Sequence, residues 1–332
     1  MNRIQNRCAA LLAGLTLAGA AGQALAQAAP AADWPQRPVR VVVPYGPGSS
    51  PDILARLVNE RLTARLGQAF IVENRPGAGG NSGTEYVAKA TPDGQTFLLS
   101  VNAPLVYNTI LYKNLRYDPF RELAPVTLAV TSPNVCAAAN SMGVDSVKGW
   151  LEALKRNPGQ YNFASTGSGS IAHLGVELIK LRTQSFAVHI PYASSGQAVT
   201  ALIAGDVHFA CLPPVAVMPQ VKAGRLKALA VTSAQRFDLL PELPTLRESG
   251  IPDIQAEPWF AYMAPQGTPP DVVQRMSREI AAVLKDPETR QRLQGAYFNP
   301  VGSTPQELNK FMNDELARWK PVILRAGLKP EN

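Results

Sequence analysis

The sequence predicts an α/β fold in two domains with mostly parallel sheets, and three observations predict it. Short apolar or β-branched runs alternate with segments of helical spacing from residue 39 to residue 231. A chain of 332 residues is longer than one hydrophobic core usually serves. The last quarter of the chain changes character and becomes helical, which suggests that it packs back on the first domain.

The first elements follow a strand and helix cycle. Residues 39–43 form a nearly continuous β-branched run, which is typical of a parallel strand buried on both faces. A helix follows, with Ser50 as its cap, Pro51 in its first turn and Gly67 at its end. The cycle repeats with a strand at 69–73, a helix at 82–90, a turn at 92–94 and a strand at 96–101.

The middle of the chain continues the alternation. We expect strands at 126–130, 135–139, 161–165, 187–190, 207–211 and 227–231, with helices at 146–156, 171–183 and 196–204. Beyond the proline-rich residues 240–244 we expect only helices, at 270–284, 287–293 and 305–326. The first domain then comprises residues 34–124 plus about 240–332, the second about 125–239, and the chain crosses between them twice.

The N-terminus predicts export. Arg3 and Arg7 precede the apolar residues 9–21, and Ala24-Leu25-Ala26 supplies an A-x-A cleavage site. We expect residues 1–26 to be a signal peptide that is cleaved near Ala26, which makes the mature protein periplasmic. No later stretch approaches the roughly 18 consecutive apolar residues of a membrane-spanning helix.

Charge and cysteine usage exclude several kinds of site. The net charge is +7, but the lysines and arginines are scattered among acids, so no nucleic-acid surface is expected. The three histidines and three cysteines lack metal-ligand spacing, so we expect neither a metal nor a cofactor. Cys136 and Cys211 remain after cleavage; two buried free thiols are at least as compatible with their apolar runs as a disulfide.

Two loops between a strand and a helix carry the candidate binding groups. The first contains Tyr45, Gly48, Ser49, Ser50 and Asp52. Backbone N–H groups at a helix start favour anions, glycines allow close approach, and serine hydroxyls add donors. An ordinary capped turn is an equally good interpretation of this loop by itself.

The second loop has the same character with more hydroxyls. It contains Thr166, Ser168, Gly169 and Ser170, with His173 in the following helical turn. Two such loops in different halves of the chain suggest that they enclose one ligand from opposite sides. Because neither loop contains lysine or arginine, amides, hydroxyls and bridging water would hold the ligand, which suits a carboxylate better than a polyphosphate.

Enzymatic motifs are absent from the sequence. There is no G-x-x-x-x-G-K-[ST] loop and no G-x-S-x-G nucleophile elbow, and the glycines at 77–83 miss the dinucleotide fingerprint. These glycines indicate a loop near the hinge or surface. Ser168 or Ser170 with His173 could imitate a serine–base pair, so a serine-dependent hydrolase is the remote alternative to a binding protein without catalytic residues.

Several motifs occur in a recognisable order. Pro44 to Asp52 is followed by V-E-N-R-P-G-A-G-G-N at 72–81, P-D-G-Q-T-F-L at 92–98, Y-D-P-F at 117–120 and S-T-G-S-G-S at 165–170. I-P-Y at 190–192 and A-G-R-L-K-A-L-A-V-T at 223–232 continue the order. The whole mature chain resembles the Bug receptor family, the extracytoplasmic solute receptors of tripartite tricarboxylate transporters.

The resemblance implies a periplasmic-binding-protein-like Venus flytrap, in which two α/β domains close on a carboxylated ligand. The two loops would supply the binding groups, Asp52 would order its loop, and His173 would be structural or ligand-facing. Tyr192 would line the cleft with its ring and hydroxyl, and Ser194 stands in the same segment.

Departures from the family pattern bear on the ligand. Gly48-Ser49 replaces P-G-G, and Tyr192-Ala193-Ser194 replaces Y-K-G and removes a cation. Leu212 stands where amino-acid binders carry aspartate. We therefore expect a monomer that takes a dicarboxylate or an aromatic acid to the membrane components of a tripartite transporter. Presentation of the ligand to a two-component sensor kinase is the alternative.

Overall fold

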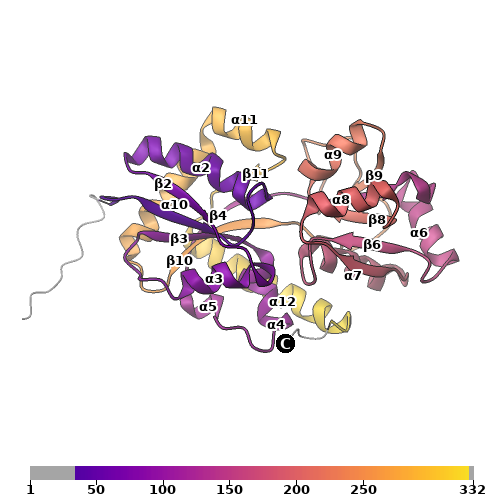
Figure 1. The fold of residues 1–332 in the computed structure, drawn as a ribbon, viewed down its shortest axis with the longest axis horizontal. Coiled ribbons are helices and arrows are strands. Elements are labelled where there is room, and N and C mark those ends of the chain that lie inside the picture. Colours follow the sequence, from indigo (N-terminus) through magenta and orange to yellow (C-terminus); the bar gives the residue numbers. More distant parts are fainter. Residues whose placement is uncertain (1–33, 329–332) are drawn as a thin grey trace, which may run out of the picture. The chain divides into compact units, whose positions relative to one another are not determined.

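The described residues form two β-sheets, and the chain passes from the first sheet to the second and back again. The structure is a computed structural model and describes residues 34–328 (Figure 1). The predicted signal peptide, residues 1–26, and its cleavage site lie outside the described residues. The chain leaves the first sheet after β4 (Leu123–Thr131) and returns to it at β10 (Trp259–Pro265), as the two predicted crossovers require.

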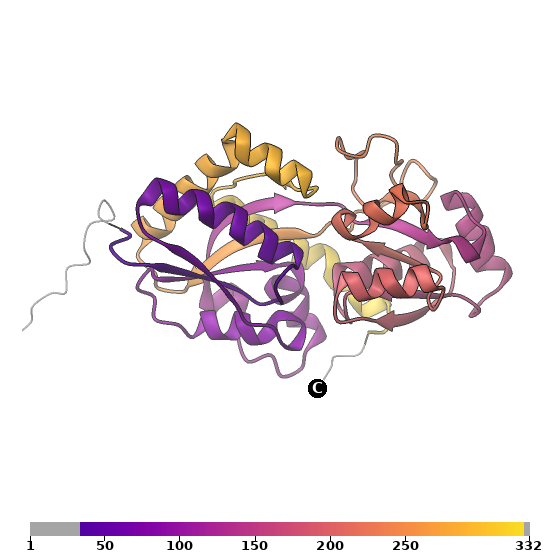
Figure 2. The ribbon, with the colours of Figure 1, turned by 45° about the horizontal axis from the view of Figure 1, so that its top comes forward.

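The first sheet has six strands in the order β11-β4-β10-β3-β1-β2. Its α-helices lie on both faces, with α2 on one face and α3 on the other (Figure 2). Its other strands are β1 (Val39–Val43), β2 (Phe70–Asn74), β3 (Thr96–Val101) and β11 (Asn299–Pro300). Its helices are α2 (Ser50–Leu66), α3 (Asn81–Ala88), α4 (Asn108–Leu111), α5 (Pro119–Glu122), α10 (Pro270–Lys285), α11 (Pro287–Gly295) and α12 (Pro305–Arg325), with short turns η2 (Ala78–Gly80) and η3 (Ala103–Tyr107).

The second sheet has five strands in the order β7-β6-β8-β5-β9. These strands are β5 (Val135–Ala139), β6 (Asn162–Ser165), β7 (Val188–Pro191), β8 (Phe209–Leu212) and β9 (Leu226–Val231). Its helices are α6 (Val147–Arg156), α7 (Ile171–Thr183), α8 (Ser195–Ala204) and α9 (Pro214–Lys222), with the short turn η4 (Asn140–Met142). Trp150, Phe163 and Phe209 are fully buried in its core.

The strands and helices predicted between β1 and α8 are all present, but the short elements η3, α4 and α5 between β3 and β4 were not predicted, and the sheets are mixed rather than mostly parallel. β1 pairs in parallel with β2 and β3, and β6 pairs in parallel with β7 and β8. β10 lies antiparallel between β3 and β4, and β5 lies antiparallel between β8 and β9. β5 and β10 are the strands that follow the two crossings, and each runs in the opposite direction to both of its neighbours.

The prediction of a purely helical C-terminal part was wrong. β10 is buried along all seven of its residues and occupies the middle of the first sheet. A strand covered on both faces lacks the apolar and polar alternation that identifies a half-buried strand. Helix α9 was also missed, because adjacent prolines form its N-cap, Pro213, and its first residue, Pro214, and Pro219 stands inside it.

The two crossings are hydrogen-bonded to each other. The Ser132 N–H donates to the Pro258 carbonyl over 3.0 Å, and the Thr232 N–H donates to the Asn134 carbonyl over 3.0 Å. The Thr232 hydroxyl donates to the Ala256 carbonyl at 2.8 Å and accepts from the Asn134 N–H at 2.9 Å. Thr232 is buried, so this side chain ties the outgoing and returning segments together.

A disulfide joins the two cysteines of the second sheet. Cys136 on β5 and Cys211 on β8 are register partners on neighbouring antiparallel strands, and their sulfurs are bonded. The structure therefore supports a disulfide and not two free thiols. The sequence could not decide between them because only strand pairing brings the two residues, 75 positions apart, into contact.

Candidate functional site

Both candidate loops follow the carboxyl ends of parallel strands. The first loop, residues 44–52, connects β1 to α2, and the second loop, residues 165–170, connects β6 to α7. In α/β sheets, ligands bind beyond the carboxyl ends of the strands, where helices begin with unpaired N–H groups. The sequence-predicted residues thus lie at the edges of both sheets where a ligand site is expected.

Asp52 organises the first loop rather than pointing into open space. Its carboxylate accepts from the Gly48 N–H at 2.9 Å, from Asn74 Nδ2 at 2.9 Å and from two nitrogens of Arg56 at 2.9 and 3.1 Å. Burial opposes its ionisation, but hydrogen bonds from Arg56, Gly48 and Asn74 lower its pKa below the ordinary value. These bonds tie the carboxylate to the first loop, to β2 and to the next turn of α2, which supports its expected loop-ordering role.

The start of α2 differs from the prediction by one residue. Ser49, not Ser50, is the N-cap residue, and its hydroxyl donates to the Gly46 carbonyl at 2.7 Å. Ser50 is the first helical residue, followed by Pro51, which has no N–H to satisfy. Gly48 has φ of 77°, a left-handed conformation that a glycine adopts without strain.

The second loop is held by Ser165 and His189. The Ser165 hydroxyl donates to the Gly167 carbonyl at 3.0 Å and accepts from the Gly167 N–H at 3.1 Å. His189 Nε2 lies 2.6 Å from the same hydroxyl oxygen. The imidazole and the hydroxyl therefore share a hydrogen bond, which supports the second loop from β7. Sequence reasoning missed His189, because only the pairing of β6 with β7 brings it to Ser165.

Gly169 brings the second loop against the first sheet's helix α4. Its φ is 75°, and a Cβ at this position would lie 2.5 Å from Cδ1 of Leu111. Its N–H donates to His173 Nδ1 at 3.1 Å. A side chain here would therefore meet both an unfavourable backbone conformation and a neighbouring helix.

The hydroxyls of the predicted site residues fall into two groups. Those of Ser49 and Ser170 donate to loop carbonyls, and that of Ser194 accepts from the Gln197 N–H as the cap of α8. The hydroxyls of Ser50, Thr166, Ser168 and Tyr192 have no hydrogen-bond partner within residues 34–328. Tyr45 differs from Tyr192, because its hydroxyl donates to the Gly79 carbonyl at 3.1 Å.

The glycine-rich residues 77–83 lie beside the first loop, a placement that sequence reasoning missed. A Cβ on Gly80 would lie 2.8 Å from the Tyr45 hydroxyl, so the glycine permits this approach. The next residue, Asn81, accepts at Oδ1 from Asn108 Nδ2 at 2.6 Å and from the Tyr117 hydroxyl at 2.9 Å. The motif therefore positions Tyr45 and the start of α3.

His173 and His189 stack on each other as neutral rings. Their centroids are 3.7 Å apart and their planes are inclined by 9°. Burial, His189 and Lys180 lower the pKa of His173 to about 3, and burial and Lys180 lower the pKa of His189 to about 4. Glu177, whose carboxylate lies 3.7 Å from His173 Nε2, also pairs with Lys180 at 2.7 Å.

We expect the stability of the protein to fall as the pH decreases below about 6.5. An unfolded histidine takes up a proton near pH 6.5. In the folded protein, His189 remains neutral down to about pH 4 and His173 down to about pH 3. The unfolded state then binds more protons, so each histidine lowers the free energy of unfolding by at most about 1.4 kcal/mol per pH unit.

Urea unfolding at several pH values between about 7 and about 5 measures this slope. A His189→Gln variant, which cannot be protonated, should show a smaller slope over the same interval. An unchanged slope in this variant would contradict the assignment.

The remote hydrolase interpretation gains no support from the geometry. His173 Nδ1 accepts from the Gly169 N–H, and the Ser170 hydroxyl donates to the Gly167 carbonyl. Neither Ser168 nor Ser170 has a hydrogen bond to an imidazole among the described residues. The part of the chain that the structure covers also contains no group of three potential metal ligands, and none of its helices is long and apolar enough to span a bilayer.

Comparisons with known proteins agree with this architecture. Residues 54–328 match the family described as "Tripartite tricarboxylate transporter family receptor". Protein BugT of Bordetella pertussis is 37% identical over 297 residues, which cover 89% of this chain and 91% of BugT.

Two solved structures are similar over most of the chain. The structure of R. palustris Rpa4515 with adipate has a TM-score of 0.85 at 34% identity and covers 90% of this chain and 100% of Rpa4515. The structure of MatC (Rpa3494) from Rhodopseudomonas palustris with bound malate has a TM-score of 0.79 at 28% identity and covers 87% of this chain and 100% of MatC. The predicted α/β fold of a periplasmic binding protein is confirmed.

Proposed function

Because the chain belongs to the family of tripartite tricarboxylate transporter receptors, we propose that it captures a small organic carboxylate and delivers it to the membrane components of such a transporter. Receptors of this family bind solutes and are periplasmic. Delivery requires export, which residues 1–26 would direct with cleavage near Ala26. Closure of two domains, residues 34–124 plus about 240–332 and about 125–239, would couple ligand binding to a shape that the membrane components recognise.

The free hydroxyls of the two loops carry this proposal. Ser50 stands in the first turn of α2, and Thr166 and Ser168 precede α7, each with an unused hydroxyl among the described residues. Tyr192 adds a fourth hydroxyl. It directly follows β7, and its backbone N–H donates to the Ser165 carbonyl at 3.0 Å, which holds it beside the second loop. Neutral donors and helix N-termini stabilise a carboxylate without a buried cation.

A dicarboxylate is the favoured ligand class, with an aromatic acid as the alternative within the same site. The solved relatives contain adipate and malate, which are both dicarboxylates. Leu212 ends β8 and is fully buried, so no carboxylate at this position can pair with a ligand ammonium group. Two loops on two sheets also suit a ligand with an anionic group at each end.

Thermal unfolding against a panel of mono-, di- and tricarboxylates, aromatic acids and amino acids tests the ligand class. A ligand at about 100 times its dissociation constant adds roughly 2.7 kcal/mol to the stability of the folded state. We expect a dicarboxylate to raise the melting temperature most. For the best ligand, Thr166→Ala and Ser168→Ala should each weaken binding about 3- to 10-fold, because each removes one hydrogen bond.

Ser141→Ala is the matched control. Ser141 is exposed in η4, beyond the end of β5, and β5 runs antiparallel to β8, so this position lies at the opposite edge of the second sheet. Calorimetric titration should give the wild-type affinity for this variant. Wild-type affinity in the Thr166 and Ser168 variants, or no stabilisation by any carboxylate, would contradict the proposed site.

A further inference from the structure

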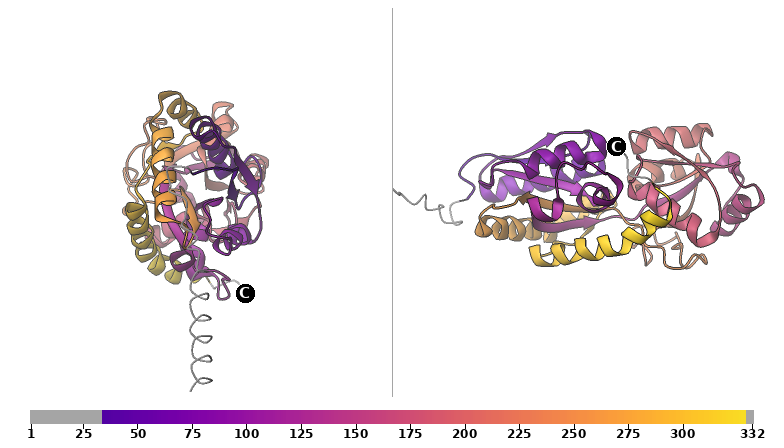
Figure 3. Two further views of the ribbon diagram at one scale, coloured as in Figure 1. Left: turned by 90° about the vertical axis from the view of Figure 1, so that its left-hand side faces the viewer. Right: turned by 90° about the horizontal axis from the view of Figure 1, so that it is seen from below.

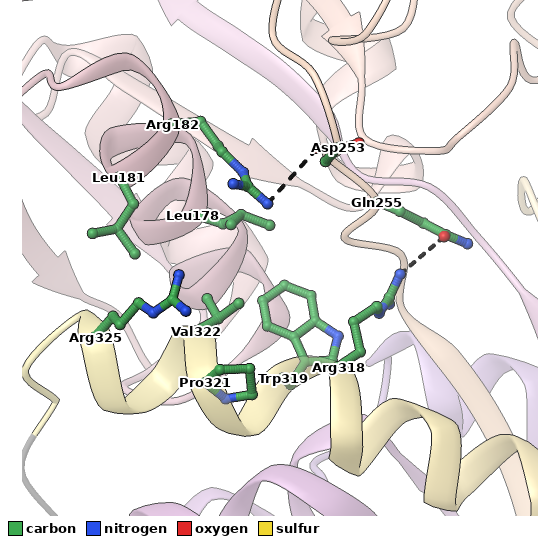
Figure 4. Close-up of a pocket in the computed structure, with 10 residues that line it drawn as sticks. All are labelled: Leu178, Leu181, Arg182, Asp253, Gln255, Arg318, Trp319, Pro321, Val322 and Arg325. Carbon is green, nitrogen blue, oxygen red and sulfur yellow. Dashed lines mark hydrogen bonds and ion pairs between the residues drawn. The ribbon is translucent and has the colours of Figure 1, made fainter.

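A second pocket lies away from the two loops, between α7, α12 and the returning crossing at residues 253–255 (Figure 4). Its volume is about 390 Å³, within the range of sites for small organic molecules. Figure 3 shows α12 in yellow, continuing from the first sheet toward the helices of the second. Helix α12 packs on β4 and η3, whereas α7 packs on β6 and β8, so the pocket joins elements of both sheets.

The floor of the pocket is apolar and aromatic. Trp319 is 1% exposed and Leu178 is 7% exposed, and Val322 lies beside them one turn along α12 (Figure 4). Trp319 and Leu178 are too deeply buried for a ligand to stack on them, but Leu181 is 42% exposed and Val322 is partly exposed, so these two lining side chains offer apolar surface that a ligand ring can cover. Water beside these two exposed apolar side chains is easily displaced by a ligand ring, because it makes few hydrogen bonds there.

Three guanidinium groups surround this floor, and only one carboxylate among the lining residues opposes them. Arg182 comes from α7, and Arg318 and Arg325 come from α12 (Figure 4). Arg182 approaches Asp253 only to 3.9 Å. Arg325 has no hydrogen-bond or ion-pair partner within the described residues, so two of the three cations keep donors free for a ligand.

The third arginine is already used by the protein but leaves one donor unsatisfied. Arg318 donates to Glu315 at 2.5 Å and to Gln255 at 2.9 Å. Its Nε and the indole Nε1 of Trp319 are buried and lack any partner among the described residues. Arg318 is therefore fixed by Glu315 and Gln255, which leaves Arg182 and Arg325 to pair with a ligand.

We propose that this pocket is a second ligand site, which binds an aromatic carboxylate. The ring would pack against Leu181 and Val322, and the carboxylate would pair with Arg182 and Arg325. Guanidinium groups match carboxylates in geometry and form strong charge-assisted hydrogen bonds. A polyphosphate would leave the apolar floor uncovered, and a neutral hydrocarbon would leave the arginines unpaired.

The site goes beyond the proposed carboxylate capture, because none of the predicted loop residues lines it. A ligand held by Arg182 on α7 and Arg325 on α12 links helices that pack on different sheets. Binding here stabilises one arrangement of the two sheets. The pocket therefore gives an aromatic acid a means of acting on the receptor without competing for the two loops.

Calorimetric titration of the purified protein with 1-naphthoate tests the proposal. We expect saturable binding to the wild type, with about tenfold weaker binding after Arg325→Ala or Arg182→Gln and none detectable in the double variant. The neutral analogue 1-naphthalenemethanol should not bind measurably. Arg290→Ala is the matched control, because Arg290 is an exposed arginine on α11 outside the pocket, and it should bind 1-naphthoate as the wild type does.

Two outcomes overturn the proposal. One is the absence of 1-naphthoate binding to the wild type at millimolar concentration. The other is wild-type affinity in the Arg182→Gln, Arg325→Ala double variant, which would place the aromatic acid elsewhere. Thr166→Ala and Ser168→Ala separate the two sites: if they weaken 1-naphthoate binding while the double arginine variant does not, the ligand occupies the loops.

Discussion

Replacing Cys136 and Cys211 together by alanine is expected to lower the free energy of unfolding by about 4 kcal/mol. The disulfide closes a loop with a sequence separation of 75 residues, which contains α6, β6, α7, β7 and α8. Closing so long a loop removes many conformations from the unfolded chain, and this loss is the main source of the stabilisation in the chain-entropy model. Alanine suits both positions, because each cysteine is 1% exposed on a strand.

Urea unfolding of the oxidised protein, the reduced protein and the double alanine variant measures this effect. Reduction should destabilise the wild type and leave the variant unchanged, which separates the disulfide from general effects of the reductant. If alkylation of the unfolded, unreduced protein modified both cysteines, the thiols would be free and the expected difference would vanish.

Replacing Glu315 by alanine is expected to lower the free energy of unfolding by about 3 kcal/mol. Glu315 is 5% exposed on α12. Its carboxylate accepts from the Tyr107 hydroxyl at 3.0 Å, from Trp259 Nε1 at 2.9 Å and from Arg318 at 2.5 Å. Its removal takes this acceptor from two buried neutral donors, the Tyr107 hydroxyl and Trp259 Nε1, and leaves Arg318 with its bond to Gln255. Arg318 is 37% exposed and can reach water, which places the effect at the lower end of the range for broken buried pairs.

Asp314→Ala is the matched control for this variant. Asp314 precedes Glu315 on the same helix, but its side chain is 63% exposed and its ion pair with Lys310 is a surface pair. It should change the free energy of unfolding by less than about 1 kcal/mol. Equal losses for the two variants in urea unfolding would show that α12 is sensitive to any lost charge and that the buried carboxylate has no special role.

Glu315 also matters for the second pocket. It fixes Arg318, which lines the pocket, and it connects α12 to η3 through Tyr107 and to β10 through Trp259. These contacts hold the part of α12 that carries Trp319. The pocket floor therefore depends on a carboxylate whose importance no local sequence pattern indicates.

The sequence predicted the local features of the fold well, because they depend on neighbouring residues. The strand at 39–43 and the helix at 171–183 were predicted at their observed bounds, from β-branched runs, helical spacing and caps. The two loops were also found from local signals, since glycines and serines between a strand and a helix identify a helix start. The role of these loops in ligand binding remains a prediction.

The failures involve residues that only long-range contacts define. β10 was missed because burial on both faces removes its alternation, and its place between β3 and β4 depends on the return of the chain from the second sheet. β5 and β10, which run antiparallel to both of their neighbours, follow the same crossings. The one-residue error at the start of α2 has a different cause, because adjacent serines offer two equivalent caps.

By itself, the sequence determined the α/β class, the order of most elements, the two strand-end loops and the resemblance to a receptor family, because each is written in short segments. Only the tertiary structure decided the strand order, the Cys136–Cys211 bond, the support of Ser165 by His189 and the pocket between α7 and α12. These features join residues from separate strands and helices, and their contacts form only when the whole chain buries its apolar surface.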